Sequence, residues 1–162
     1  MTYLRFVFIN VSGTMVVSDP SVIKDTYDCL EFDKVRKGVW RVEVELGYDM
    51  GLKILKATHE DSRIMKSLFD EFKINVYSEQ VGVFDALEYR SDKSVVDMPR
   101  EQYQIVKDGD KWYCAMSHIT NSAQYGADAY NHGCLTETEN RPHKVFARKS
   151  IDGDYVEFEI KL

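Results

Sequence analysis

Residues 40–46 alternate strictly between apolar and charged side chains and read Trp40-Arg41-Val42-Glu43-Val44-Glu45-Leu46. Successive side chains of a β-strand point to opposite faces of a sheet, so this run predicts a strand with four apolar residues on one face and three charged residues on the other. One dry face and one wet face are typical of an antiparallel sheet. The glycine-flanked segment 47–51 predicts a hairpin turn into a second strand over residues 52–56.

A weak internal repeat flanks this strand. Residues 9–12 (Ile-Asn-Val-Ser) run on to residues 15–19, and residues 74–78 (Ile-Asn-Val-Tyr-Ser) run on to residues 81–85. The only two tryptophans, Trp40 and Trp112, follow in step. A repeat changes the interpretation of a whole chain. We therefore expect one compact domain over residues 1–162, made of two related halves at approximately 1–73 and 74–162.

Further strands are expected on both sides of the repeat. Residues 3–11 form a nearly continuous apolar run, which is typical of a strand buried on both faces. Asp108-Gly109 and Asp152-Gly153 are strong turn signals. They predict two hairpins, one joining residues 103–107 to 111–119 and one joining residues 144–149 to 155–160. Residues 21–37 fit neither period and are expected to form a loop.

One segment has a helical pattern. Thr58 is followed three residues later by Asp61, as in a capping box, and acidic residues suit the first turn of a helix. Apolar residues then recur at steps of three and four: Ile64, Met65, Leu68, Phe69 and Phe72. We expect an amphipathic helix over about residues 61–73, packed on the sheets. The expected fold class is α+β: an antiparallel β-rich domain from two weakly repeated halves with one amphipathic helix.

Composition limits the classes of function. The chain has 44% apolar and 30% charged residues, as in ordinary globular proteins. Its net charge of −6 argues against binding to a nucleic-acid backbone, which needs clustered lysine and arginine. No apolar run approaches the roughly 18 residues of a membrane span. Three cysteines without framework spacing fit a reducing compartment, so a cytoplasmic protein is expected.

One cluster of residues could carry chemistry. Cys114 and His118 would point the same way on a strand, and His132 and Cys134 follow in a loop. Together they could hold zinc, or Cys134 could act as a thiol nucleophile beside His132. The spacings are not those of common zinc modules, and no third group orients the pair. We therefore expect no metal, no cofactor and no catalysis, with a small metal- or thiol-dependent hydrolase as the alternative.

A long polar stretch, residues 120–141, is expected to form an irregular loop. Loops of this length in compact domains are often functional. It contains aromatic residues with small neighbours, a composition typical of contact loops, although both rings could instead fold back onto the core. The expected partner-binding residues are Tyr125, Asp128, Tyr130 and His132.

Residues 1–10 (Met-Thr-Tyr-Leu-Arg-Phe-Val-Phe-Ile-Asn) and residues 38–46 carry a resemblance to a known family. Over its full length the chain resembles the Pin inhibitors that T-even bacteriophages encode against the host ATP-dependent protease Lon. The chain also resembles an uncharacterised bacterial family of two-part β-rich domains, through Trp-Arg-Val-Glu-Val (40–44) and His-Glu-Asp (59–61). The first resemblance implies binding to Lon in the host cytoplasm without catalysis, and it supplies no set of contact residues.

The expected function is therefore inhibition of Lon by a folded protein. No segment has the disulfide bracing of a substrate-like inhibitor loop, so we expect binding outside the peptidase chamber. The alternatives are the hydrolase above and an acidic decoy of nucleic acid, which would need denser carboxylates. Whether the chain forms a homo-oligomer is left open.

Overall fold

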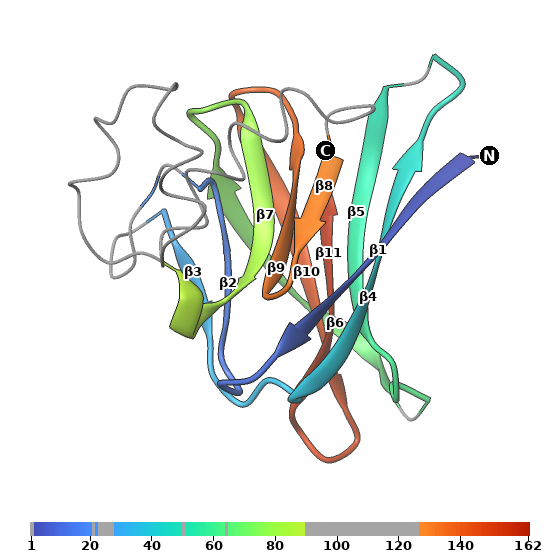
Figure 1. Cartoon of the computed structure of the whole chain (residues 1–162), viewed down its shortest axis with the longest axis vertical. Helices are drawn as coiled ribbons and strands as arrows, with labels where there is room; N and C mark the ends of the chain where they lie inside the picture. Colours follow the sequence, from blue (N-terminus) through green and yellow to red (C-terminus); the bar gives the residue numbers. More distant parts are fainter. Residues whose placement is uncertain (1, 21, 23–27, 50, 64, 90–126) are drawn as a thin grey trace.

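Two antiparallel sheets face each other across a shared apolar core (Figure 1). The computed structural model describes residues 2–20, 22, 28–49, 51–63, 65–89 and 127–162. The larger sheet has six strands in the order β1 (Thr2–Asn10), β4 (Gly38–Leu46), β5 (Leu52–His59), β11 (Tyr155–Lys161), β10 (Pro142–Ser150) and β6 (Met65–Asn75). The smaller sheet has five, in the order β3 (Leu30–Phe32), β2 (Met15–Ser18), β7 (Gln80–Asp85), β9 (Gly133–Glu137) and β8 (Ala127–Tyr130).

The alternation in residues 40–46 correctly predicted β4. Its four apolar side chains are all buried, and its charged side chains lie on the outer face of the six-stranded sheet. Trp40 lies between the rings of Phe8 and Phe158, with centroids 6.2 and 5.7 Å away. The Trp40 indole N–H donates to the carbonyl of Arg36 at 2.9 Å, so its polar atom is satisfied. The strands expected over 52–56, 144–149 and 155–160 are also present.

The first strand was predicted correctly in position but not in its surroundings. β1 is an edge strand of the larger sheet, and one of its faces is open to solvent: Val7 is 58% exposed. A continuous apolar run is compatible with burial on both faces, but the position of a strand in its sheet decides how much of its side-chain surface is buried. That place depends on distant segments, which the run does not encode.

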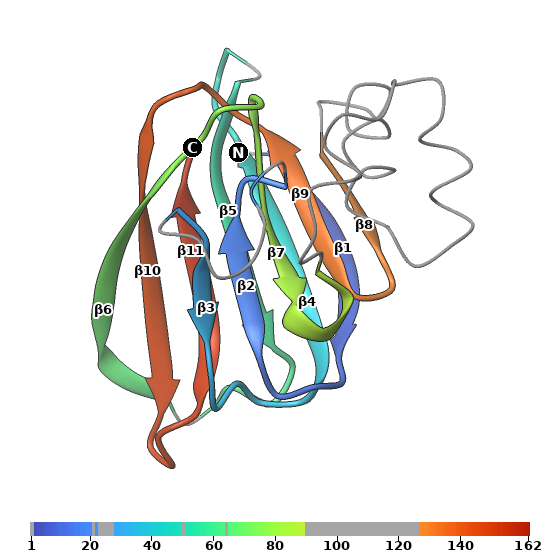
Figure 2. The same cartoon turned by 90° about the vertical axis from the view of Figure 1, so that its left-hand side faces the viewer.

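The expected helix over residues 61–73 is wrong, and with it the α+β class. β5 continues to His59, and residues 65–75 form β6, paired with β10. Within the described residues the only helical segment is a short 3₁₀ turn, η1 (Ala86–Glu88). The fold of the described part is therefore an all-β sandwich (Figure 2).

The reason for this error lies in the position of β6 at the edge of the sheet. Most of its side chains are exposed on either face, and Leu68 is 82% exposed. Phe69 lies on the outer face against Phe146, with Arg148 3.9 Å above its ring, whereas Phe72 packs on the inner side against Phe32. Apolar residues on both faces of one strand produced a spacing that resembles a helical period.

The strand order reads the same from both edges of the six-stranded sheet. β1–β4–β5 from one edge corresponds to β6–β10–β11 from the other, and β3–β2 corresponds to β9–β7 in the smaller sheet. The counterparts β5 and β11 are neighbours, and so are β2 and β7. The described part of the chain thus contains two similar arrangements of strands, here called units, that begin at β1 and β6 and meet along both sheets. Trp112, the expected counterpart of Trp40, lies outside the described residues.

Two buried aspartates connect the units reciprocally. Asp19 follows β2 and accepts from the N–H groups of Tyr77 and Ser78, at 2.7 and 2.8 Å, in the turn before β7. Asp85, 66 residues later, accepts from the N–H groups of Val11 and Ser12, at 2.7 and 3.2 Å, in the turn before β2. Each carboxylate also accepts from the serine hydroxyl of that turn, and both aspartates are fully buried.

The two turns share a backbone feature. Gly13 and Glu79, again 66 residues apart, both have positive φ (77° and 61°). Their carbonyls accept equivalent hydrogen bonds at 2.9 Å, from Val35 N–H and Thr138 N–H respectively. Positive φ is uncommon for a residue with a side chain, so the turn at Glu79 is maintained by its contacts, including those with Asp19.

Arg36 joins the linker before β4 to the turn between β10 and β11. Its guanidinium donates to both carboxylate oxygens of Asp154, at 2.7 and 3.0 Å, and to the carbonyl of Asp61 at 2.8 Å. Burial alone would raise the pKa of Asp154, but hydrogen bonds from Arg36 and Ser150 outweigh it, and the pKa is lowered. The ionised carboxylate therefore stabilises the folded state.

Removing either buried aspartate should strongly destabilise the protein. Asp85→Ala and Asp19→Ala each leave several buried donors without an acceptor, so we expect losses of about 3 kcal/mol or more in unfolding free energy. Urea denaturation followed by tryptophan fluorescence measures this. Asp33→Ala, at an exposed position, is the matched control and should change stability by less than about 0.5 kcal/mol. Equal midpoints for Asp85→Ala and Asp33→Ala would contradict the role of the buried carboxylate.

The Arg36–Asp154 pair should give a pH-dependent contribution. A carboxylate with a lowered pKa stabilises the fold above its unfolded value, and that stabilisation is lost as pH falls through the lowered value. Asp154→Asn should therefore cost about 1–2 kcal/mol near pH 7, and the difference from wild type should shrink as pH falls below the unfolded aspartate pKa of about 3.9. Asp152→Asn, which removes an exposed carboxylate 3.6 Å from the same guanidinium, should cost much less at every pH.

Candidate functional site

Strand register places the outward side chains of the six-stranded sheet in rows across it. One row, from β1 to β6, is Val7, Arg41, Thr58, Glu157, Arg148 and Phe69. The next row is Arg5, Glu43, Lys56, Glu159, Phe146 and Glu71. The first four side chains of the second row alternate in charge. Arg5 lies 3.7 Å from Glu43, and Lys56 lies 4.0 Å from Glu159. This face is therefore highly charged but mixed in sign.

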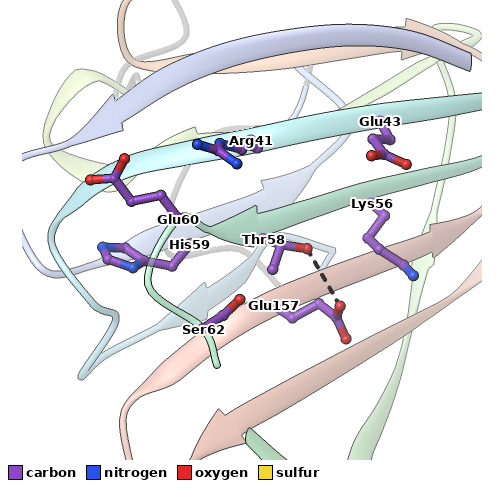
Figure 3. Close-up of a pocket in the computed structure, with 8 residues that line it drawn as sticks. All are labelled: Arg41, Glu43, Lys56, Thr58, His59, Glu60, Ser62 and Glu157. Atoms are coloured by element: carbon purple, nitrogen blue, oxygen red, sulfur yellow. Dashed lines mark hydrogen bonds between the residues drawn. The ribbon is translucent and has the colours of Figure 1, made fainter. Parts of the chain in front are cut away.

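A hollow of about 320 Å³ opens over these rows (Figure 3). Strands β4, β5 and β11 and the turn after β5 supply its lining, which consists of Arg41, Glu43, Lys56, Thr58, His59, Glu60, Ser62 and Glu157. The cross-strand pairs Arg41–Thr58 and Thr58–Glu157 bring residues from both units of the chain to one place. This hollow is the candidate functional site.

Glu157 is the most buried charged group of the site. It is 5% exposed, although it lies on the outer face of the sheet. Its nearest protein donors are distant: the Thr58 hydroxyl at 3.4 Å, drawn in Figure 3, and the Arg148 Nε at 3.5 Å. The Arg148 Nε itself is buried and makes no hydrogen bond within the described part of the chain. Because buried polar groups are normally hydrogen-bonded, this carboxylate has acceptor capacity that the described residues do not fill.

The other charged side chains of the site differ in whether they form ion pairs. Glu43 and Lys56 contact charged groups outside the hollow, Arg5 and Glu159 respectively. Arg41 and Glu60 form no ion pair within the described residues. The site thus has one buried carboxylate, that of Glu157, at its floor, and both acidic and basic side chains around its rim.

His59 has a structural role in the wall of the hollow. Its Nδ1 accepts from the Asp61 N–H at 3.0 Å, so the proton is on Nε2, which donates to the Lys37 carbonyl at 2.8 Å. The ring also lies edge-on to Trp40, 5.9 Å between centroids. With both nitrogens engaged, His59 fixes the turn after β5 and is not positioned to transfer a proton.

His143, elsewhere in the larger sheet, is also held by backbone groups. Its Nδ1 lies 2.8 Å from the Lys161 carbonyl and its Nε2 lies 2.8 Å from the Glu139 carbonyl. The ring is buried and connects the start of β10 to the end of β11 and to the loop before β10. It is therefore part of the framework and not of a reactive site.

Of the expected partner-binding residues, His132 alone has a described side chain, and it is not among the residues that line the hollow. Tyr125 is outside the described residues, and Asp128 and Tyr130 are in β8, where only the backbone is described. Residues 127–137 form the hairpin β8–β9 in the five-stranded sheet, where an irregular loop was expected. The His132 carbonyl accepts from the Asp85 N–H at 2.8 Å, and its ring Nδ1 lies 3.3 Å from the Ile9 carbonyl. His132 thus connects this hairpin to β1.

The Cys/His cluster is only partly described, because Cys114 and His118 lie outside the described residues. Cys134 lies in the core between the sheets, and burial raises the pKa of its thiol to about 12. A thiol with that pKa is protonated near neutral pH and is a poor nucleophile and metal ligand. No group of three or more potential metal ligands occurs among the residues that the structure describes.

The hollow was not predicted from the sequence. The alternation of residues 40–46 and 155–160 identified Glu43 and Glu157 as members of wet strand faces, and a solvated face was the interpretation. Their proximity depends on the pairing of β5 with β11, two strands about one hundred residues apart in the chain. A sequence pattern within either strand carries no information about that pairing.

Cys134 should be unreactive in the folded protein. Iodoacetamide at pH 8 should leave Cys134 unmodified in native protein and modify it completely in urea, because the reaction requires an exposed thiolate. Peptide mapping by mass spectrometry measures each cysteine separately. Rapid native modification of Cys134, at a rate near that in urea, would contradict its burial and reopen the thiol-dependent alternative.

Comparison with known proteins does not assign the chain to a family. No family model, no curated protein and no solved structure matches it. Among the described residues, no helix has the length and apolar character that crossing a membrane requires. The inferences about function that follow therefore rest on the resemblance noted in the sequence and on the physical chemistry of the sandwich.

Proposed function

We propose that this chain is a phage-encoded inhibitor that binds the host ATP-dependent protease Lon and blocks proteolysis as a folded protein, without mimicking a substrate in the peptidase site. The proposal begins from the resemblance carried by residues 1–10 and 38–46. These stretches contribute β1 and β4, which pair over their whole length, with Phe8 opposite Trp40. The residues that carry the resemblance thus belong to one continuous part of the fold.

The observation that best supports this proposal is the position of β11. It lies in the middle of the six-stranded sheet, paired with β5 on one side and β10 on the other. The N–H of Leu162, the residue after β11, donates to the Lys53 carbonyl at 2.9 Å. A protease that unfolds its substrates by pulling needs a flexible segment to grip. A strand held on both sides resists being pulled out of its sheet, which suits a protein that must bind such an enzyme and survive.

The charge pattern favours a protein partner over the alternatives. An acidic decoy of nucleic acid needs a continuous run of carboxylates, whereas the outer face of the larger sheet alternates acids with Arg5, Lys56 and Arg148. Mixed charges of this kind suit a protein surface of complementary pattern, where they fix orientation and exclude wrong partners. The hydrolase alternative is weakened by the buried, protonated thiol of Cys134.

The direct test uses purified Lon, ATP and an unfolded protein substrate. The added protein should slow degradation of that substrate at a near-stoichiometric ratio. It should not compete with a small peptide that enters the peptidase site without unfolding, because the folded sandwich acts elsewhere. Undiminished degradation of the unfolded substrate would remove the proposed function. Competitive inhibition of the small peptide would remove its mechanism.

The survival of the inhibitor should depend on its terminal strands. The untagged protein should remain intact during incubation with Lon and ATP, whereas a version with a long flexible segment appended after Leu162 should be degraded. Gel electrophoresis over time measures both. A tagged protein that also carries Asp85→Ala should be degraded faster still, because its fold is weakened. Equal survival of all three would show that the held strands do not protect the protein.

A further inference from the structure

The buried carboxylate of Glu157 defines what the hollow on the larger sheet can bind. It is 5% exposed, and among the residues that the structure describes, donors reach its two oxygens only at 3.4 and 3.5 Å. Good hydrogen bonds to carboxylates are about 2.7–2.9 Å long. Both oxygens therefore remain able to accept a shorter hydrogen bond from a donor that enters the hollow.

The carboxylate has two oxygens that can accept, and this decides which kind of donor group fits it best. A guanidinium presents parallel N–H groups that match both oxygens of one carboxylate, whereas an ammonium is a point charge. Glu60 and Glu43 lie at opposite ends of the hollow (Figure 3); Glu60 has no ion-pair partner within the described residues, and Glu43 is half-exposed. Lys56, the nearest lining ammonium on the neighbouring strand, contacts Glu159. These acids surround the approach to Glu157.

The hollow is also of suitable size and rigidity. Its volume of about 320 Å³ is at the lower end of the range for ligand pockets and exceeds what a single side chain requires. Three paired strands and the turn fixed by His59 form its walls. A side chain bound in a preformed site of this kind loses little free energy to rearrangement of the site, which is the behaviour of binding hot spots.

We infer that this hollow receives an arginine side chain from the surface of the partner protein, with the guanidinium on the Glu157 carboxylate and Glu60 and Glu43 at the rim. Arg41, on β4, then faces the residues of the partner protein that lie next to that arginine. It favours an acidic side chain among them. The identity of the partner rests on the proposed function, but the preference of the hollow for a guanidinium does not.

The preference can be measured without any partner. ¹⁵N-labelled protein is titrated with N-acetyl-arginine amide and followed by NMR, with the lysine, citrulline and glutamate analogues as comparisons. Saturable shifts of the Arg41, Thr58 and Glu157 amides are expected with the arginine compound, weaker shifts with lysine, and none with citrulline or glutamate. Absence of saturable shifts at these residues, or a preference for the glutamate analogue, would overturn the inference.

Two variants separate binding from folding. Glu157→Gln should weaken arginine binding by about tenfold or more, whereas Glu159→Gln, on the same face of β11, should leave it unchanged. If Glu157→Gln does not fold, as judged by its spectrum and melting temperature, Ser62→Tyr blocks the rim without touching the carboxylate and should also abolish the shifts. Unchanged binding in a folded Glu157→Gln, or in Ser62→Tyr, would overturn the inference.

The same variants then connect the site to Lon. Glu157→Gln should lose inhibitory potency by about tenfold or more while Glu159→Gln retains it. If the wild-type protein does not inhibit Lon at all, the proposed function fails, but the titration still decides whether the hollow binds a guanidinium. If the wild type inhibits and the folded Glu157→Gln inhibits equally, this hollow is not part of the contact.

Discussion

The exchange of buried aspartates between the two units is the interaction on which the rest of the structure depends. A buried carboxylate is unfavourable unless donors surround it, and here three donors to Asp19, the N–H groups of Tyr77 and Ser78 and the Ser78 hydroxyl, belong to the turn of the other unit. Asp85 likewise needs the first turn, and it also accepts from the N–H of Leu87 in η1. Neither unit can therefore bury its own aspartate without the other.

This reciprocity determines how the sandwich is assembled. The same two turns bring β2 beside β7, the strands at whose ends the aspartates lie, and the pairing of β5 with β11 completes the contact in the larger sheet. Both sheets thus contain strands from both units. Such interleaving favours a single cooperative transition over separate unfolding of halves. It also explains why the candidate site, on the β5–β11 pair, exists only in the whole protein.

Local patterns in the sequence were sufficient where a strand has one dry face and one wet face. β4 and β11 were predicted from alternation alone, because the alternating apolar residues of 40–46 and 156–160 face the core. β6 was not, because a strand at a sheet edge can place Leu68 and Phe69 in contact with solvent and lose its period of two. The hollow was beyond prediction for a different reason. Its central contact, between Thr58 and Glu157, joins residues whose neighbourhood is set only by long-range pairing.

The unequal positions of the two terminal strands make the molecule mechanically anisotropic. β1 is an edge strand that pairs with β4, and its other side meets the β8–β9 hairpin at Ile9, near the end of the strand, so a force on the amino-terminal end can peel its first residues away a few hydrogen bonds at a time. β11 is bonded along both sides, so the same force on the carboxyl-terminal end must shear two ladders together. Pulling single molecules from each end would measure this difference. An unfolding motor would thus meet a weaker barrier at one end of this chain than at the other.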